Sequence, residues 1–116
     1  PMNYLILDSL SKFSDYYGSD YEVEFPTNSG QMINIKDAAS EVSKRLLALF
    51  QQGKDGKFPM YGEYDKIQND EEFHKHHLFF EYFDGDTGKG LGANHQTGWT
   101  GLISEIIHQL YGTKES

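Results

Sequence analysis

The strongest constraint on the fold is a stripe of apolar residues that recurs every three or four positions between Ile35 and Phe50. Its members are Ile35, Ala38, Ala39, Val42, Leu46, Leu49 and Phe50. This spacing places all of them on one face of an α-helix. Asp37 stands in a capping position and Gly53 follows the last turn, so we expect a helix from Asn34 to Gln52.

Two further segments carry helical patterns. Met2 to Tyr17 is apolar on more than one face before Gly18, which predicts a helix with neighbours on both sides. Trp99 to Tyr111 carries a second clean stripe, with Thr97 as its cap. Residues 70–83, with the sequence DEEFHKHHLFFEYF, fit a helix and an irregular segment equally well.

The connections between these segments are long. Tyr21 to Asn34 contains Pro26 and Gly30 and predicts a loop, with a short extended piece at Glu22 to Phe25. Lys54 to Asn69 is a second polar connection. Because connections in helix bundles usually have about 2 to 8 residues, we expect an all-α fold that is part of a larger helical architecture. The apolar face formed by Leu5, Leu7 and Leu10 should then be exposed in this chain.

Composition excludes several classes of function. The 116 residues carry a net charge of −8 and no basic cluster, so nucleic acid is not an expected partner. There is no cysteine, which excludes disulfides, zinc–thiolate sites and thiol catalysis, and which fits a cytoplasmic location. No apolar run approaches the roughly 20 residues of a membrane span, and we expect no membrane partner.

Three patterns approach known site motifs. Residues 84–88 begin like a calcium loop, but Lys89 and His95 stand where that loop needs glycine and glutamate. The glycines of the same segment loosely follow the dinucleotide-binding fingerprint, without the second strand and its acidic residue. Glu71 with His74 and Glu105 with His108 have the spacing of carboxylate-bridged dimetal helical bundles. Both pairs lie in polar surroundings, so the dimetal bundle is kept only as a second alternative, and we expect no metal or cofactor.

Glu81 is the one acid inside an aromatic run, between Phe80 and Tyr82. A carboxylate held among aromatic rings loses hydration, and such groups serve in general acid–base chemistry. The competing interpretation is the exposed edge of a strand or helix, with Glu81 pointing to water. The residues alone favour that second interpretation.

Residues 79–102 read FFEYFDGDTGKGLGANHQTGWTGL. This segment resembles the C-terminal signature of glycoside hydrolase family 63, which includes mannosyl-oligosaccharide glucosidases and cytosolic glucosidase-like proteins. In that signature an E-x-Y/F-D/N element precedes T-G-x-G-x-G and then T-G-W-T or T-G-W-S. The matching residues are Glu81, Phe83, Asp84, Thr87, Gly88, Gly90, Gly92, Thr97, Gly98, Trp99 and Thr100. The opening PMNYLILDSL is also similar to the family helix that follows a G-P-x-W motif.

The resemblance implies the C-terminal portion of an (α/α)6 barrel, with residues 1–116 as a segment of one catalytic domain. It implies that Glu81 is the general base of an inverting α-glucosidase, and that the general acid is an aspartate in an earlier segment. Two such carboxyl groups lie roughly 6.5 to 9.5 Å apart. The 116 residues alone should therefore be inactive. The alternative is a non-catalytic carbohydrate-binding or interaction fragment.

The same resemblance implies the partners of the chain. They are an oligosaccharide or small glucoside substrate and the remainder of the parent chain, or a companion fragment. Trp99 at its helix start is expected either to stack on a sugar or to anchor the helix. Tyr82, Asn94 and His95 are expected to bind substrate.

Overall fold

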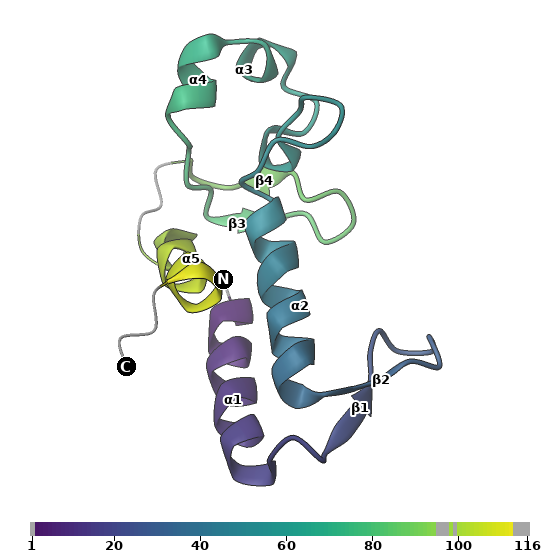
Figure 1. Cartoon of the computed structure of the whole chain (residues 1–116). Coiled ribbons are helices and arrows are strands. Elements are labelled where there is room, and N and C mark those ends of the chain that lie inside the picture. The colour runs from purple at the N-terminus through teal and green to yellow at the C-terminus, as the bar shows by residue number, and fades with distance from the viewer. Residues whose placement is uncertain (1, 95–97, 99, 113–116) are drawn as a thin grey trace. The chain divides into compact units, whose positions relative to one another are not determined.

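The computed structural model describes residues 2–94, 98 and 100–112 (Figure 1). Contacts between Cα atoms divide the chain into two compact units, residues 2–45 and the chain from Leu46 onward. The units are taken one at a time below.

The first unit begins with helix α1, Met2–Tyr17, as the sequence predicts. Gly18 ends the helix with a positive φ of 74°, and its N–H donates to the carbonyl of Ser14 at 2.9 Å. Glycine adopts this left-handed conformation without steric cost, which explains the sharp stop.

Helix α1 has an exposed apolar face, as expected, but not all of the residues predicted for this face are exposed. Leu5 is 51% exposed, but Leu7 is buried and Leu10 is half-buried. The large exposed side chains of α1 are Met2, Leu5, Ile6, Phe13, Tyr16 and Tyr17. The prediction is therefore confirmed for Leu5 and wrong for Leu7.

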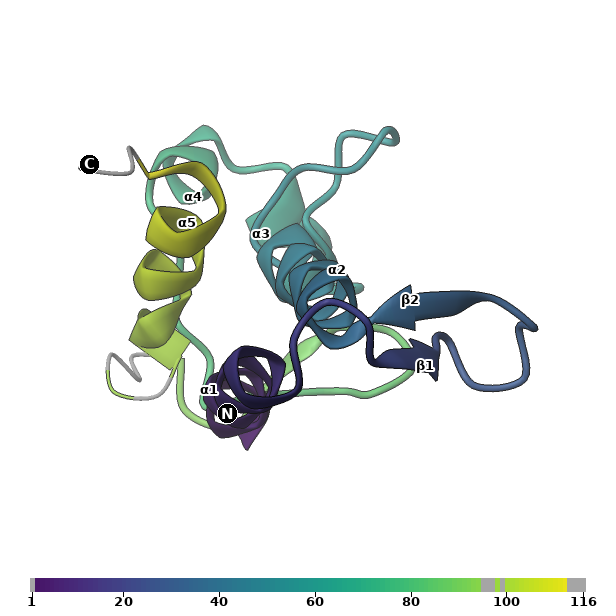
Figure 2. The same cartoon turned by 60° about the horizontal axis from the view of Figure 1, so that its bottom comes forward.

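A hairpin follows α1. Strand β1, Glu22–Glu24, pairs antiparallel with β2, Met32–Asn34 (Figure 2). In this pairing Val23 lies opposite Ile33. The short extended piece expected near Glu22 is confirmed. Its partner β2 was expected to be loop, because three residues before a strong helix signal are too few to show alternation.

Helix α2 spans Ile35–Ala48 and crosses from the first unit into the second. The side chain of Asn34 accepts a hydrogen bond from the N–H of Asp37 at 2.8 Å, so Asn34 is the cap of this helix. The helix ends four residues before the predicted Gln52. Its final turn tightens into bonds between residues three apart, such as Phe50 N–H to Leu47 O at 3.0 Å.

The core of the second unit is aromatic. Met60 and Tyr61, in the short 3₁₀-helix η1 (Pro59–Tyr61), have no exposed surface. The Tyr61 ring packs edge-on against Phe58 at 5.6 Å and Phe80 at 6.4 Å between centroids. Its hydroxyl donates to the carbonyl of Phe73 at 3.1 Å, so the one polar atom of this buried ring is satisfied.

Gln68, at the end of helix α3 (Asp65–Gln68), is buried in this core. Its amide accepts from Phe58 N–H at 3.0 Å and donates to the carbonyls of Phe58 at 2.9 Å and Gly62 at 3.0 Å. The Gln68 side chain thus provides hydrogen-bond partners for backbone N–H and C=O groups that have no partner in a helix or strand.

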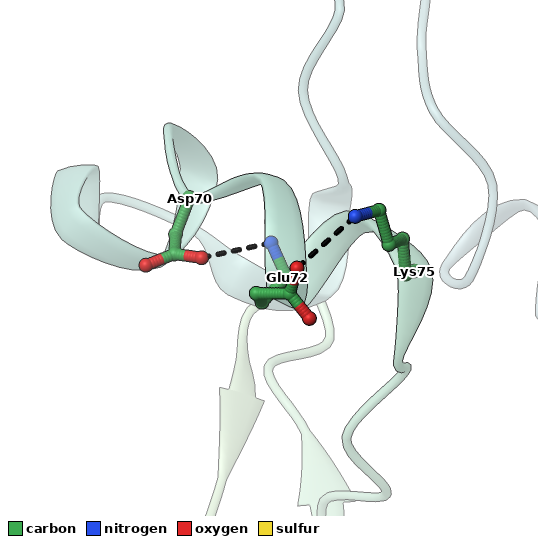
Figure 3. Close-up of polar contacts among 3 residues, drawn as sticks. All are labelled: Asp70, Glu72 and Lys75. Atoms are coloured by element: carbon green, nitrogen blue, oxygen red, sulfur yellow. Dashed lines mark hydrogen bonds and ion pairs between the residues drawn. The ribbon is translucent and has the colours of Figure 1, made fainter.

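Helix α4, Glu71–Lys75, resolves the open choice for residues 70–83 in favour of one helical turn followed by extended chain. Asp70 caps it by accepting from Glu72 N–H at 2.8 Å, and Lys75 pairs with the Glu72 carboxylate at 3.0 Å (Figure 3). Because the ion pair is exposed, the cap contributes more to this short helix than the pair does.

The second unit continues with a hairpin and a helix. Strands β3, Tyr82–Phe83, and β4, Gly90–Leu91, are antiparallel. A 3₁₀ turn, η2 (Thr100–Leu102), leads into helix α5, Ile103–Tyr111, which buries Ile103 and Ile106. The predicted C-terminal helix is confirmed from Ile103, while its expected start at Trp99 and cap at Thr97 lie outside the described residues.

The prediction of an all-α fold, and with it a portion of an (α/α)6 barrel, is wrong. The fold is mixed, with helices and two small antiparallel hairpins. Each strand has two or three residues, and so few positions cannot display the alternation by which strands are recognised in a sequence. Among the helices of the described residues, none is long and apolar enough to cross a membrane.

Candidate functional site

The hairpin β3–β4 carries Glu81 at its edge. Tyr82 pairs with Leu91 and Phe83 with Gly90. The ladder extends one step further, because Glu81 N–H donates to the carbonyl of Ala93 at 2.8 Å. The backbone on both sides of Glu81 is thus fixed, which sets the direction in which its side chain leaves the hairpin.

The carboxylate of Glu81 is exposed and is held at one oxygen. Its Oε2 accepts from Ala93 N–H at 3.2 Å. Gly92 has a φ of 72°, and a Cβ on it would lie 2.7 Å from Glu81 Oε2 and 2.8 Å from Tyr82 Cε1. Only glycine therefore leaves room for the carboxylate in this place.

Two aromatic residues near Glu81, Phe80 and Phe83, pack against other rings of the unit. Phe80 is buried, and Phe83 packs edge-on against Phe50 at 5.7 Å between centroids. Gly90 lies so close to the Phe80 ring that a Cβ would come within 2.3 Å of it. Of the two interpretations of Glu81, the structure therefore favours the exposed edge over the aromatic enclosure. The rings secure the hairpin to the core and leave the carboxylate open to water.

Asp84 organises the turn that joins the two strands. Its Oδ1 accepts from Thr87 N–H at 2.8 Å, from Thr87 Oγ1 at 2.9 Å and from Asp86 N–H at 3.0 Å. The hydrogen bonds from Thr87, and after them the one from Asp86, lower the pKa of the Asp84 carboxyl below its usual range. The charged form of Asp84 therefore favours the folded turn.

This network predicts an acid-sensitive turn. A carboxyl whose pKa is lower in the folded chain contributes stability above its unfolded pKa of about 3.9, and that contribution is lost as the pH falls through the folded value. In a pH titration followed by NMR, the Thr87 amide proton should shift with a midpoint below 3.8. Asp84→Asn keeps an oxygen acceptor but cannot ionise, so this midpoint should disappear. A midpoint at or above 3.8 in the unmodified protein would contradict the role given to Asp84.

The expected substrate-binding residues are only partly described. Tyr82 is 47% exposed and lies against Gly92 beside the Glu81 carboxylate, while Asn94 is exposed just beyond Ala93. Trp99 and His95 lie outside the described residues. The structure thus brings Glu81 and Tyr82 together on one open edge of the hairpin.

The sequence did not predict that Ala93 positions Glu81. Ala93 acts through its backbone N–H and C=O, which leave no side-chain signal. The glycines at alternate positions 88, 90 and 92 are the signal that could have indicated it, because a period of two is typical of a strand.

The histidines near α4 have structural contacts. His77 Nε2 lies 2.9 Å from the carbonyl of Phe50, and the rings of His74 and His77 pack edge-on against Phe58. In the other proposed pair, Glu105 accepts from the side chain of Gln109 at 3.3 Å. No group of three or more histidine or acidic side chains in the described part of the chain could hold a metal ion.

Comparison with known proteins gives one informative similarity. The chain is 44% identical over 112 residues to "Uncharacterized protein YMR196W" of Saccharomyces cerevisiae. The match covers 95% of this chain and 10% of the yeast protein, so the chain spans about a tenth of the length of this relative. No model of a protein family matches the chain. No solved structure matches it.

Proposed function

We propose that this chain supplies the general base, Glu81, and part of the sugar-binding surface of an inverting glycoside hydrolase that acts on α-glucosides. The proposal rests on the resemblance of residues 79–102 to glycoside hydrolase family 63. The observation that carries it is the carboxylate at the matching position, which is exposed and oriented by Ala93 N–H and the space at Gly92.

The proposed reaction needs a carboxylate that water can reach. A water molecule attacks the anomeric carbon and gives its proton to Glu81. The bond from that carbon to the glycosidic oxygen breaks, and this oxygen takes a proton from a general acid on the opposite face of the sugar. By the same resemblance the acid is an aspartate from another part of the protein, so the proposal is made for a longer protein that contains this segment.

The geometry suits a general base in two respects. Glu81 Oε2 is occupied by Ala93 N–H, which leaves Oε1 for water among the described contacts. Tyr82, half exposed beside it, offers an aromatic face of the kind that packs against the C–H groups of a sugar ring.

The stereochemistry of the product tests this proposal. The full-length protein should hydrolyse methyl α-glucoside, in which the attacked sugar is the sole glucose released, and proton NMR at early times should show β-glucose as the first product. Methyl β-glucoside is the matched control and should remain intact. Initial release of α-glucose would contradict an inverting mechanism. Binding of methyl α-glucoside without hydrolysis would favour the non-catalytic carbohydrate-binding alternative.

A further inference from the structure

The first unit contains a second candidate site, which uses no residue of the hairpin β3–β4. A pocket of about 450 Å³ lies between the β1–β2 hairpin and one face of α2. Phe25 and Ile33 line it from the hairpin, and Asp37, Ser40 and Arg45 line it from the helix. Its size falls in the usual range of small-molecule sites, about 300 to 1,000 Å³.

The loop wall of the pocket is fixed by its own hydrogen bonds. Phe25 N–H donates to Gln31 O at 2.9 Å, and Ser29 N–H donates to Pro26 O at 3.0 Å. The carboxylate of Glu24 accepts from Gly30 N–H at 2.8 Å. Because these bonds already order the loop, a ligand does not have to order it on binding.

Arg45 forms one end of the pocket. The centre of its guanidinium lies 5.2 Å from the centroid of the Phe25 ring, a cation–π contact that holds the planar group in place. Among the described residues Arg45 forms no ion pair within hydrogen-bonding distance. A guanidinium beside an aromatic ring, with N–H groups outside any ion pair, is suited to bind a carboxylate with two parallel hydrogen bonds.

Asp37 forms the other end. Its N–H is bonded to Asn34, and its carboxylate has no hydrogen-bond partner in the part of the chain that the structure describes. Asp37 and Arg45 are eight residues apart on α2, which corresponds to about 12 Å along the helix axis.

The stretch between the two ends is electrically neutral. Lys44 donates to Glu41 at 2.9 Å, and Lys44 is the main cause of the lowered pKa of Glu41, to which Arg45 contributes least. Among the described residues, the two charged groups of the pocket outside an ion pair are therefore the carboxylate of Asp37 and the guanidinium of Arg45.

We propose that this pocket binds a short extended peptide with free ends, with its ammonium group at Asp37 and its carboxylate at Arg45. Three extended residues span about 10 Å, close to the roughly 12 Å between residues 37 and 45 along the helix axis. The apolar surface of Phe25 and Ile33 faces the middle of such a ligand, where its small side chains lie. A neutral sugar matches neither of the two opposite charges. This site stands independently of the function proposed for Glu81.

Calorimetric titration of the full-length protein with trialanine tests the proposal. Trialanine should bind, and blocking its amino end by acetylation or its carboxyl end by amidation should each weaken binding about tenfold, because each removes one charge-assisted contact. Arg45→Gln should abolish the effect of amidation and keep the effect of acetylation. Asp37→Asn should do the reverse. Lys36→Gln, an exposed change on the same helix outside the pocket, is the matched control and should leave all three affinities unchanged.

The proposal is overturned if trialanine shows no binding up to about 10 mM, a concentration above the Kd of even weak specific ligands. It is also overturned if the doubly blocked peptide or maltose binds as tightly as trialanine. Circular dichroism of each variant establishes that the helix is retained, so that a lost effect reports on the pocket.

Discussion

Glu81→Gln is expected to lower the turnover of an α-glucoside by the full-length protein by about 10² to 10⁴, the usual contribution of a general base. Glutamine has nearly the same shape, and its oxygen can still accept from Ala93 N–H as Glu81 Oε2 does at 3.2 Å. Its amide cannot take the proton of the attacking water. Because only the transition state loses an interaction, kcat should fall while KM changes little.

The control for this substitution is Glu63→Gln, which removes an exposed carboxylate of the same unit outside residues 79–102. It should leave both constants unchanged. If Glu81→Gln retained more than about a tenth of the activity, the loss would be too small for general-base catalysis. Glu81 would then be an exposed residue at a strand edge, which is the other interpretation of its sequence.

Tyr61→Ala is expected to destabilise the second unit by about 3 to 5 kcal/mol, as for other large aromatic residues removed from a core. Tyr61 has no exposed surface, and its ring contacts Phe58, Phe73 and Phe80. At roughly 0.05 to 0.15 kcal/mol per residue, a unit of this length has little stability to spare, so most of the unit should unfold. Urea unfolding followed by circular dichroism measures the change.

Tyr61→Phe separates the ring from its hydroxyl. It keeps the packing and loses the hydrogen bond to Phe73 O, so it should cost only about 1 kcal/mol. Equal losses for the two substitutions would contradict the claim that ring packing holds this core. A loss below about 1 kcal/mol for Tyr61→Ala would show that the buried ring is replaceable.

The sequence predicted the helices that carry a long run of regularly spaced apolar residues. It missed short strands, which carry no such run. The stripe of α2 runs for four turns, and its position was predicted correctly although its last turn tightens early. Strands β2, β3 and β4 have two or three residues each, and their pairing depends on partners across a loop. That information is not local, so the mixed fold was predicted as all-α.

At the candidate site, too, local sequence patterns were informative, and features that depend on contacts between distant residues were not. The motif in residues 79–102 identified Glu81, and the residues alone favoured an exposed edge over an aromatic enclosure for its carboxylate. The structure agrees with the exposed edge, because Phe80 is buried, Phe83 packs against Phe50 and Glu81 is open to water. The Asp37–Arg45 pocket had no motif at all, since it depends on how the loop at Phe25 folds against α2.

Chemical rescue tests the central claim, that Glu81 is a general base, most directly. Glu81→Ala removes the carboxylate and leaves space beside the anomeric carbon. Azide is an anion with no proton to lose, so it needs no base to attack that carbon from the face where water would enter. The account predicts that azide restores cleavage of an α-glucoside by this variant and that the product is β-glucosyl azide. Cleavage that stays absent with azide, without any glucosyl azide formed, would contradict the role of Glu81.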